Sequence, residues 1–252
     1  MKILIVNDDG IDSPLLQLLA ELSKALGEVT VVAPAAQCSA MSHRITVMGE
    51  MDIIPVQDFP VEGVQAYSVT GTPADCVKVA VYYVCKEKPD AVFSGINKGL
   101  NVGFDICYSG TVGAAMEGIM LGIPSYAWSL DWGDDEALEK GKETVKANFL
   151  RIAGDLLKKQ LPYGYIWNVN FPNCDAALCR GMQWERVPEQ AMNYLDAFDK
   201  TVEPDGRIHL VSTLAHQDKF TDGSDLRAIR DNYISVGVVG NAVMTAGEHL
   251  RY

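Results

Sequence analysis

The sequence lacks several features that would assign it at once to a structural or functional class. No hydrophobic run reaches the roughly 18 residues of a membrane-spanning helix, and the opening MKILIV is typical of a strand rather than of a signal peptide. The six cysteines form no CxxC pair, and Cys174 and Cys179 lack the further Cys or His ligands of a zinc site. We therefore expect a cytoplasmic protein whose thiols are reduced and mostly buried.

Positive charge is also scarce. The 252 residues include 21 Lys and Arg against 33 Asp and Glu, which gives a formal net charge of −12. This balance argues against general binding to nucleic acid or to anionic membranes, although one bound cation can reverse the local field and admit a small anionic substrate. The sequence also has no GxGxxG after its first strand, no P-loop and no GxSxG elbow, so the usual dinucleotide, P-loop and serine-esterase sites are disfavoured.

The first two-thirds of the chain alternates apolar strands with helices. Apolar runs predict strands at 3–6, 29–33, 66–69, 91–93, 124–128 and 166–169. Helix-start signals occur at Ser13-Pro14, at the capping box Thr72-Pro73-Ala74-Asp75 and at Ser109-Gly110-Thr111, and a long helix is expected over 135–158. This order predicts an α/β fold, a Rossmann-like and mainly parallel sheet with helices on both faces.

The pattern changes after Phe171. Residues 172–252 contain short alternating stretches, for example at 208–211 and 233–239, separated by turns. We therefore divide the chain into an α/β catalytic core, 1–171, and a β-rich C-terminal extension, 172–252, that serves oligomerisation or covers the site. Within the core, the mixed segment 34–65 predicts two further short strands, near 45–47 and 53–56.

Polar residues follow several of the predicted strands. Asp8 and Asp9 come directly after the first strand, Ser39 lies in the loop after the second, and Asn97 follows the strand at 91–93. Ligands in open parallel sheets bind beyond the carboxyl ends of the strands, where these loops would converge. Adjacent carboxylates repel each other unless a positive charge lies beside them, and oxygen ligands suit Mg²⁺, Mn²⁺ or Ca²⁺. Asp8 and Asp9 are therefore predicted metal ligands; the alternative is that one of them caps the first helix, although Asp12 or Ser13 can already do so.

A candidate phosphate site lies at the start of the helix after residue 108. Ser109, Gly110 and Thr111 combine hydroxyl donors with the free N–H groups of a helix N-terminus, which favour anions; the alternative is an ordinary helix cap. Lys98 could pair with a carboxylate or with substrate phosphate, or it could be a solvated lysine. His43 could border the site or have a structural role.

Several segments of the sequence resemble those of the SurE survival proteins, the 5'/3'-nucleotidases. The matching segments are ILIVNDDG (3–10), VVAPAAQCSAMSHRIT (31–46), VTGTPADCV (69–77), SGINKGLNVGFDICYSGTVGAAMEG (94–118) and TDGSDLRAIRDNYISV (221–236). The resemblance implies a Rossmann-like fold and a C-terminal extension that exchanges elements between subunits, giving homodimers or homotetramers. It departs at Ala35, Ala36 and Gln37, where basic residues are usual, and this leaves the substrate preference open.

The resemblance also implies a phosphomonoesterase that acts on nucleoside monophosphates and depends on one divalent cation. Its metal ligands would be Asp8, Asp9, Ser39 and Asn97, with the two aspartates in the catalytic role. Substrate contacts fall on Asn97, Lys98, Ser109, Gly110 and Thr111. The expected mechanism is attack by a metal-activated water. Two alternatives stay open: an aspartyl-phosphate phosphatase with Asp8 or Asp9 as nucleophile, and a non-catalytic nucleotide-binding regulatory module.

Overall fold

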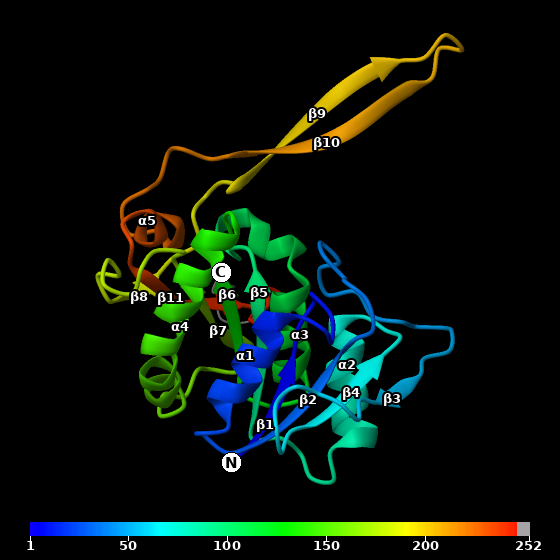
Figure 1. Ribbon diagram of the computed structural model, residues 1–252, viewed down its shortest axis with the longest axis vertical. Helices are drawn as coiled ribbons and strands as arrows, with labels where there is room; N and C mark the ends of the chain where they lie inside the picture. The colour runs from blue at the N-terminus through cyan, green and yellow to red at the C-terminus, as the bar shows by residue number, and fades with distance from the viewer. Residues whose placement is uncertain (246–252) are drawn as a thin grey trace, which may run out of the picture.

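The computed structural model describes residues 1–245, which form a nine-stranded sheet flanked by helices and a separate two-stranded ribbon (Figure 1). In chain order the elements are β1 (Lys2–Val6), α1 (Pro14–Ser23), β2 (Glu28–Pro34), β3 (Ile53–Pro55), β4 (Gln65–Val69), α2 (Pro73–Val79), the π-helical turn η1 (Ala80–Val84), β5 (Ala91–Lys98), the 3-10 helix η2 (Gly103–Tyr108), α3 (Gly110–Met120), β6 (Ser125–Leu130), α4 (Asp135–Leu156), β7 (Tyr165–Phe171), β8 (Met182–Arg186), β9 (Tyr194–Val202), β10 (Ile208–His216), α5 (Asp225–Arg230) and β11 (Ile234–Gly240).

The sheet is mainly parallel, as the alternating pattern predicts. Its strand order is β3-β4-β2-β1-β5-β6-β7-β11-β8. The six strands from β4 to β7 all pair in parallel, whereas β3 and β11 run antiparallel to their neighbours β4 and β7. All six parallel strands therefore end at the same edge of the sheet, and the loops that follow them start there.

Helices cover both faces of the sheet, as the apolar strands require. Along β1, Ile3 and Ile5 pack in one core cluster with residues of α1 and α4, including Leu19 and Phe149. The alternate residues Leu4 and Val6 pack in a second cluster with α2 and α3. Since successive side chains of a strand point to opposite faces, one short apolar strand supports two layers of helices and is buried from both sides.

Two of the predicted strands differ from the structure. The strand predicted at 91–93 continues as β5 to Lys98, with a register irregularity between Ser94 and Asn97. Gly95 makes this possible, because its φ is +133° and a Cβ atom there would overlap the carbonyl oxygen of Trp128. The strand predicted at 45–47 was wrong: these residues lie in a loop. The prediction at 53–56 is confirmed as β3.

The C-terminal part of the chain is β-rich, as expected, but it is divided between two places. β8 and β11 extend the main sheet beyond β7, and β9 and β10 form an antiparallel ribbon that projects from the body of the protein (Figure 1). The division at residue 171 stays a prediction, and residues 246–252 of the extension lie outside the described residues. Within residues 1–245, every helix is too short or too polar to cross a membrane.

Candidate active site at the carboxyl ends of the strands

A tight turn places two carboxylates directly after β1. The amide of the fully buried Asn7 accepts a hydrogen bond from the Gly10 N–H at 3.2 Å and donates one to the Gly10 carbonyl at 2.9 Å. These two bonds close the chain around Asp8 and Asp9, so both side chains start from a fixed turn at the edge of the sheet.

Asp8 lies against the N-terminus of α3 and is only 5% exposed. Its carboxylate accepts hydrogen bonds from the Thr111 hydroxyl at 2.7 Å and from the Thr111 N–H at 3.1 Å. Burial raises the pKa of Asp8 to about 6; the Thr111 hydroxyl opposes this shift and the charge of Asp9 adds to it. Gly110 permits the contact, because a Cβ atom there would lie 2.9 Å from both Cβ and Oδ2 of Asp8.

Asp9 connects β1 with the end of β5. One oxygen of its carboxylate accepts the Lys98 N–H at 3.0 Å. Burial raises the pKa of Asp9, and the hydrogen bond and the charge of Lys98 oppose this shift. The ammonium group of Lys98 lies 6.0 Å from the centre of the Trp132 ring, so this side chain already has a cation–π partner.

Asn97 and Ser39 each adjoin a residue whose N–H is hydrogen-bonded to the turn that carries these carboxylates, Lys98 in one case and Cys38 in the other. The Asn97 side chain donates to the Gly99 carbonyl at 2.9 Å, which leaves its own carbonyl oxygen without a donor in residues 1–245. The Cys38 N–H donates to the Asp8 carbonyl at 2.7 Å and so holds the loop after β2 against Asp8. The exposed hydroxyl of the adjoining Ser39 has no hydrogen bond to any described residue.

The predicted phosphate site is built differently from what the sequence indicates. The Ser109 hydroxyl caps α3 by accepting the Val112 N–H at 3.0 Å, and both donors of Thr111 are directed at Asp8. In the described part of the chain, the Ser109 hydroxyl proton and the Gly110 N–H remain without partners. Thr111 therefore positions Asp8, and the donors available to an anion are on Ser109 and Gly110.

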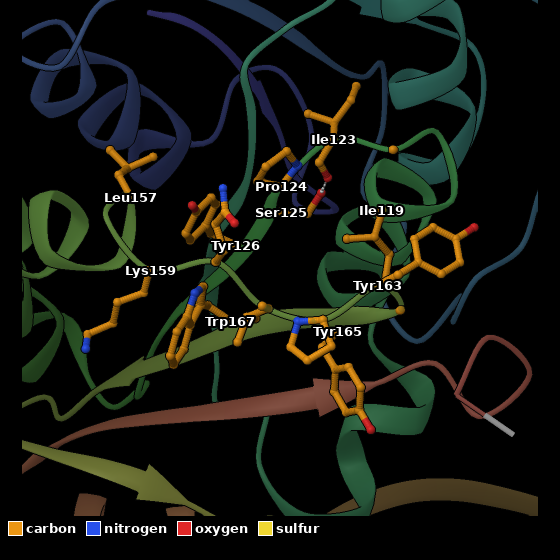
Figure 2. A pocket seen from close by; sticks show the side chains of 15 residues that line it. Ile119, Ile123, Pro124, Ser125, Tyr126, Leu157, Lys159, Tyr163, Tyr165 and Trp167 are labelled. Atoms are coloured by element: carbon orange, nitrogen blue, oxygen red, sulfur yellow. Dashed lines mark hydrogen bonds between the residues drawn. The ribbon is translucent and has the colours of Figure 1, made fainter. Parts of the chain in front are cut away.

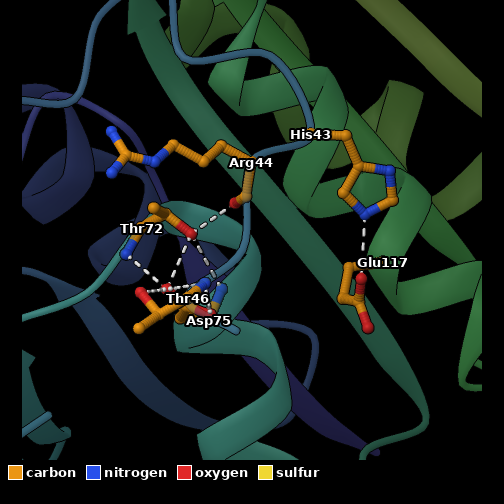
Figure 3. A network of polar contacts seen from close by, with 6 residues as sticks. All are labelled: His43, Arg44, Thr46, Thr72, Asp75 and Glu117. Atoms are coloured by element: carbon orange, nitrogen blue, oxygen red, sulfur yellow. Dashed lines mark hydrogen bonds and ion pairs between the residues drawn. The ribbon is translucent and has the colours of Figure 1, made fainter. Parts of the chain in front are cut away.

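The loop after β2 is anchored by a buried carboxylate that sequence reasoning assigned only to a helix cap (Figure 3). Asp75 forms the predicted capping box with Thr72 and also accepts the N–H and hydroxyl of Thr46, at 2.9 and 2.8 Å. Burial raises the pKa of Asp75, but the hydrogen bonds from Thr46 and Thr72 outweigh it and lower the pKa below its ordinary value. The Thr72 hydroxyl in turn donates to the Arg44 carbonyl at 2.6 Å.

A second anchor joins the same loop to α3. His43 lies 2.8 Å from the carboxylate of Glu117, which is 5% exposed (Figure 3). Next to it, Ser42 donates its N–H to the Tyr108 carbonyl and its hydroxyl to that of Cys107. The role of His43 that the sequence left open is therefore a structural one at the border of the site. Its partner is 74 residues away, so no local spacing could have identified it.

Residues beyond 171 also reach the site. The Leu100 N–H donates to the Tyr194 hydroxyl at 3.2 Å, and Asp105 accepts the N–H groups of Asn193 and Tyr194. The base of the β9–β10 ribbon thus supports the loop that follows Asn97. No sequence motif announces these contacts, because each one joins segments about 90 residues apart.

The donor set fits a hard divalent cation. Within residues 1–245 no three His, Cys, Asp or Glu side chains are grouped so that they could hold a metal, so a cation here would need the amide and hydroxyl oxygens of Asn97 and Ser39 beside Asp8 and Asp9. Oxygen donors of these types suit Mg²⁺, Mn²⁺ or Ca²⁺.

Comparisons with known proteins find a matching family model and similar sequences. The family model described as "Survival protein SurE" matches residues 3–194. The chain is 40% identical over 238 residues to "5'-nucleotidase SurE 1" of Thermus thermophilus, covering 94% of this chain and 90% of that protein. It is 37% identical over 238 residues to "5'-nucleotidase SurE" of Christiangramia forsetii, covering 93% and 88%.

A solved structure has the same fold. The crystal structure of the SurE protein from Aquifex aeolicus superimposes with a TM-score of 0.81 at 32% identity, covering 95% of this chain and 93% of that one. The similarity extends through the β-rich C-terminal part as well as the α/β core. On its sequence and its fold together, the chain belongs to the SurE family.

Proposed function

We propose that the protein is a metal-dependent nucleotidase that hydrolyses nucleoside 5'- and 3'-monophosphates to nucleoside and phosphate. Relatives with 37–40% identity are named 5'-nucleotidase, which supports nucleotidase activity. The observation that carries the proposal is the contact between Asp8 and the N-terminus of α3. It puts the buried carboxylate of Asp8 and the partly buried one of Asp9, suited to a cation, beside the free donors of Ser109 and Gly110, suited to an anion.

Each residue of this site has a definite part in the proposal. Asp8, Asp9, Ser39 and Asn97 would hold one Mg²⁺, Mn²⁺ or Ca²⁺ per subunit, and the cation would neutralise phosphate charge and lower the pKa of a water. Thr111 fixes the orientation of the Asp8 carboxylate.

The remaining residues would bind the substrate. The Ser109 hydroxyl and the Gly110 N–H would donate to phosphate oxygens and stabilise charge that develops there in the transition state. The Asn97 amide and the Lys98 ammonium would contact the phosphate from the end of β5, with Lys98 leaving the Trp132 ring to do so.

The test is phosphate release from matched pairs of 5'- and 3'-monophosphates of adenosine, guanosine, cytidine and uridine. Each pair is assayed with Mn²⁺, with Mg²⁺ and with EDTA, using the wild type, Asp8→Asn and the control Asp12→Asn, an exposed residue four positions away. We expect release that EDTA and Asp8→Asn abolish and Asp12→Asn preserves. Release that persists in EDTA would contradict the metal requirement, and binding without release would favour the regulatory module.

The same contact weakens the aspartyl-phosphate alternative for Asp8 as the nucleophile and leaves it open for Asp9. Both oxygens of Asp8 accept hydrogen bonds from Thr111, an arrangement that orients a ligand or a base rather than a free nucleophile. Mass spectrometry of protein quenched during turnover separates the two mechanisms. A phosphate found on Asp8 or Asp9 would establish the covalent route, and its absence is expected here.

We further propose that the protein acts as a homodimer or homotetramer through the β9–β10 ribbon. The ribbon exposes large apolar side chains, among them Phe198, Val202, Ile208, Leu210 and Val211, and an isolated two-stranded ribbon is only marginally stable. Light scattering should give a dimer or tetramer mass for the wild type and a monomer for Phe198→Glu/Leu210→Glu. The six cysteines, all free, support the proposed cytoplasmic location.

A further inference from the structure

A pocket opens at the edge of the sheet opposite to Asp8. It has a volume of about 410 Å³ and lies among the first residues of β6 and β7, the last turn of α3 and the loop between α4 and β7. The candidate active site adjoins the last residues of β1 and β5, which run parallel to β6 and β7. The two sites are therefore separated by the length of the strands. The volume falls in the roughly 300–1,000 Å³ range of small-molecule sites.

The walls of this pocket are aliphatic and aromatic (Figure 2). Tyr126, Leu157 and Trp167 lie on one side, and Ile119 and Tyr163 lie on the other. Tyr163 is 66% exposed, so an aromatic ring stands at the mouth. The lining includes no Asp or Glu, and its one Lys, Lys159, holds its ammonium 5.3 Å from the centre of the Trp184 ring. The pocket therefore offers stacking surfaces and no free charge.

Two polar groups of the lining lack partners within residues 1–245. The indole nitrogen of Trp167 is buried and makes no hydrogen bond. The side chain of Tyr126 packs by its ring against Phe93 and Trp128, is 3% exposed overall, and has no hydrogen bond on its hydroxyl. Burial raises the pKa of this phenol to about 12, so it remains a donor at neutral pH. A buried donor such as the Trp167 indole normally has an acceptor, and leaving it unpaired is costly.

We propose that this pocket is a second ligand site, which takes a flat, neutral aromatic heterocycle of nucleobase size with hydrogen-bond acceptors along its edge. The rings of Tyr163 and Trp167 provide faces on which such a molecule stacks. The Trp167 N–H and the Tyr126 hydroxyl receive its acceptor atoms. The site is independent of the proposed nucleotidase chemistry, because none of its lining residues belongs to the Asp8 site.

The test follows the four Trp indole N–H signals of ¹⁵N-tryptophan-labelled protein in NMR spectra during titration with adenine. Trp167→Phe and Trp132→Phe assign the two informative signals, since Trp167 lines the pocket and Trp132 lies beside Lys98 at the other edge. We expect adenine to shift the Trp167 signal and to leave that of Trp132 in place. A shift at Trp132 alone, or no shift, would overturn the proposal.

A matched pair of variants checks that the pocket itself is occupied. Leu161→Phe fills part of it, whereas Leu178→Phe adds the same ring at an exposed position beside the first turn of α4. We expect Leu161→Phe to weaken adenine binding at least tenfold and Leu178→Phe to leave it unchanged. Trp167→Phe keeps an aromatic ring but removes the N–H donor and part of the stacking surface, and it should weaken binding at least fivefold, as measured by calorimetry.

Equal adenine binding by Leu161→Phe and the wild type would place the ligand elsewhere and reject the proposal. So would a Trp167 signal that moves with protein concentration in the absence of adenine, because a second copy of the chain would then cover the pocket. Thermal melts of both variants establish that each is folded, and the nucleotidase assay under Proposed function gives results that do not depend on either outcome.

Discussion

The two edges of one parallel sheet differ in chemistry. At the carboxyl edge, short polar side chains on loops are fixed by hydrogen bonds from distant segments, as Asp8 is by Thr111 and Asp9 by Lys98. At the opposite edge, large rings line a pocket in which the Trp167 N–H has no partner among the described residues. The first edge presents paired carboxylates, and the second presents a pocket with no free charge.

Because of this difference, we expect the two edges to respond to different kinds of substitution. A lost charge or a methyl group added near Asp8 should affect chemistry, because the ligand positions depend on contacts near 3 Å. A ring added in the pocket should affect only what the pocket binds. The following experiments test this separation, from the largest expected effect to the smallest.

The largest effect is expected from Asp8→Asn. Phosphate release should fall about 1,000-fold or more, since removing one ligand of a metal site removes most of the transition-state stabilisation the cation supplies. The melting temperature of the EDTA-treated protein should change little, because the amide removes a buried charge but accepts only one of the two hydrogen bonds from Thr111. Normal turnover by the folded variant would remove Asp8 from the site.

Gly110→Ala should reduce turnover about 100-fold. Its Cβ atom would lie 2.9 Å from Asp8, so α3 or the carboxylate must shift, and misplacement on this scale costs about that factor. Gly154→Ala is the matched control, because a Cβ atom there meets nothing within 4 Å and alanine favours the helix interior. Similar activity of the two variants in a steady-state assay would show that the close contact is not needed.

His43→Ala and Glu117→Gln should each weaken activation by Mn²⁺ about tenfold with a smaller effect on the maximal rate. His43→Ala removes the 2.8 Å contact that seats the Ser39 loop on α3, and Glu117→Gln removes the carboxylate charge from it. Supports of this kind typically contribute 10- to 100-fold to metal affinity. The readout is the Mn²⁺ concentration dependence of turnover, together with Mn²⁺ binding followed by paramagnetic resonance. His209→Ala, at an exposed position of β10, is the control.

Stability should depend on pH through Asp225, at the start of α5. Burial raises its pKa to about 6, and hydrogen bonds from Glu189, Gly103 and Leu226 oppose this shift only in part. Because the pKa of Asp225 is higher in the folded state than in the unfolded state, its contribution to the free energy of unfolding is fully present below about pH 3.8. That contribution is lost as the pH rises through 6 and the buried carboxyl group ionises. Denaturant unfolding should show that the free energy of unfolding falls between pH 5 and pH 7, and that this fall is about 1 kcal/mol smaller in Asp225→Asn than in the wild type. The same pH dependence of the free energy of unfolding in Asp225→Asn and the wild type would show that the pKa of Asp225 is not raised.

The smallest effect is expected at the opposite edge. Leu161→Phe should leave turnover of every nucleotide within about twofold of the wild type, because its ring enters the pocket and touches none of the Asp8 site. A tenfold fall in turnover, with the melting temperature unchanged, would show that the two edges are coupled.

The elements that the sequence predicts well are those decided by local contacts. The run of apolar residues in β1, the capping box of Thr72 and Asp75, and the Ser109 cap of α3 all depend on neighbours within a few residues. The extension of β5 to Lys98 was missed because Gly95 and the polar residues around it are typical of a loop. Here tertiary contacts with β6 override that preference.

In the candidate site, too, local features were predicted from the sequence and long-range contacts were not. The positions of Asp8, Asp9 and Ser109 follow from the ends of predicted elements. What holds them does not: the Asp8–Thr111 bond spans 103 residues and the His43–Glu117 contact 74. Such pairs meet only once the sheet order is known. For the same reason, the sequence assigned Thr111 to the phosphate, whereas the structure directs its donors to Asp8.

The most direct test is an anomalous difference map from a crystal soaked in Mn²⁺, measured at the manganese absorption edge. A single strong peak coordinated by the carboxylates of Asp8 and Asp9, the Asn97 amide oxygen and the Ser39 hydroxyl is the result expected. A saturated soak with no peak at the end of β1, or with manganese bound only elsewhere, would contradict it.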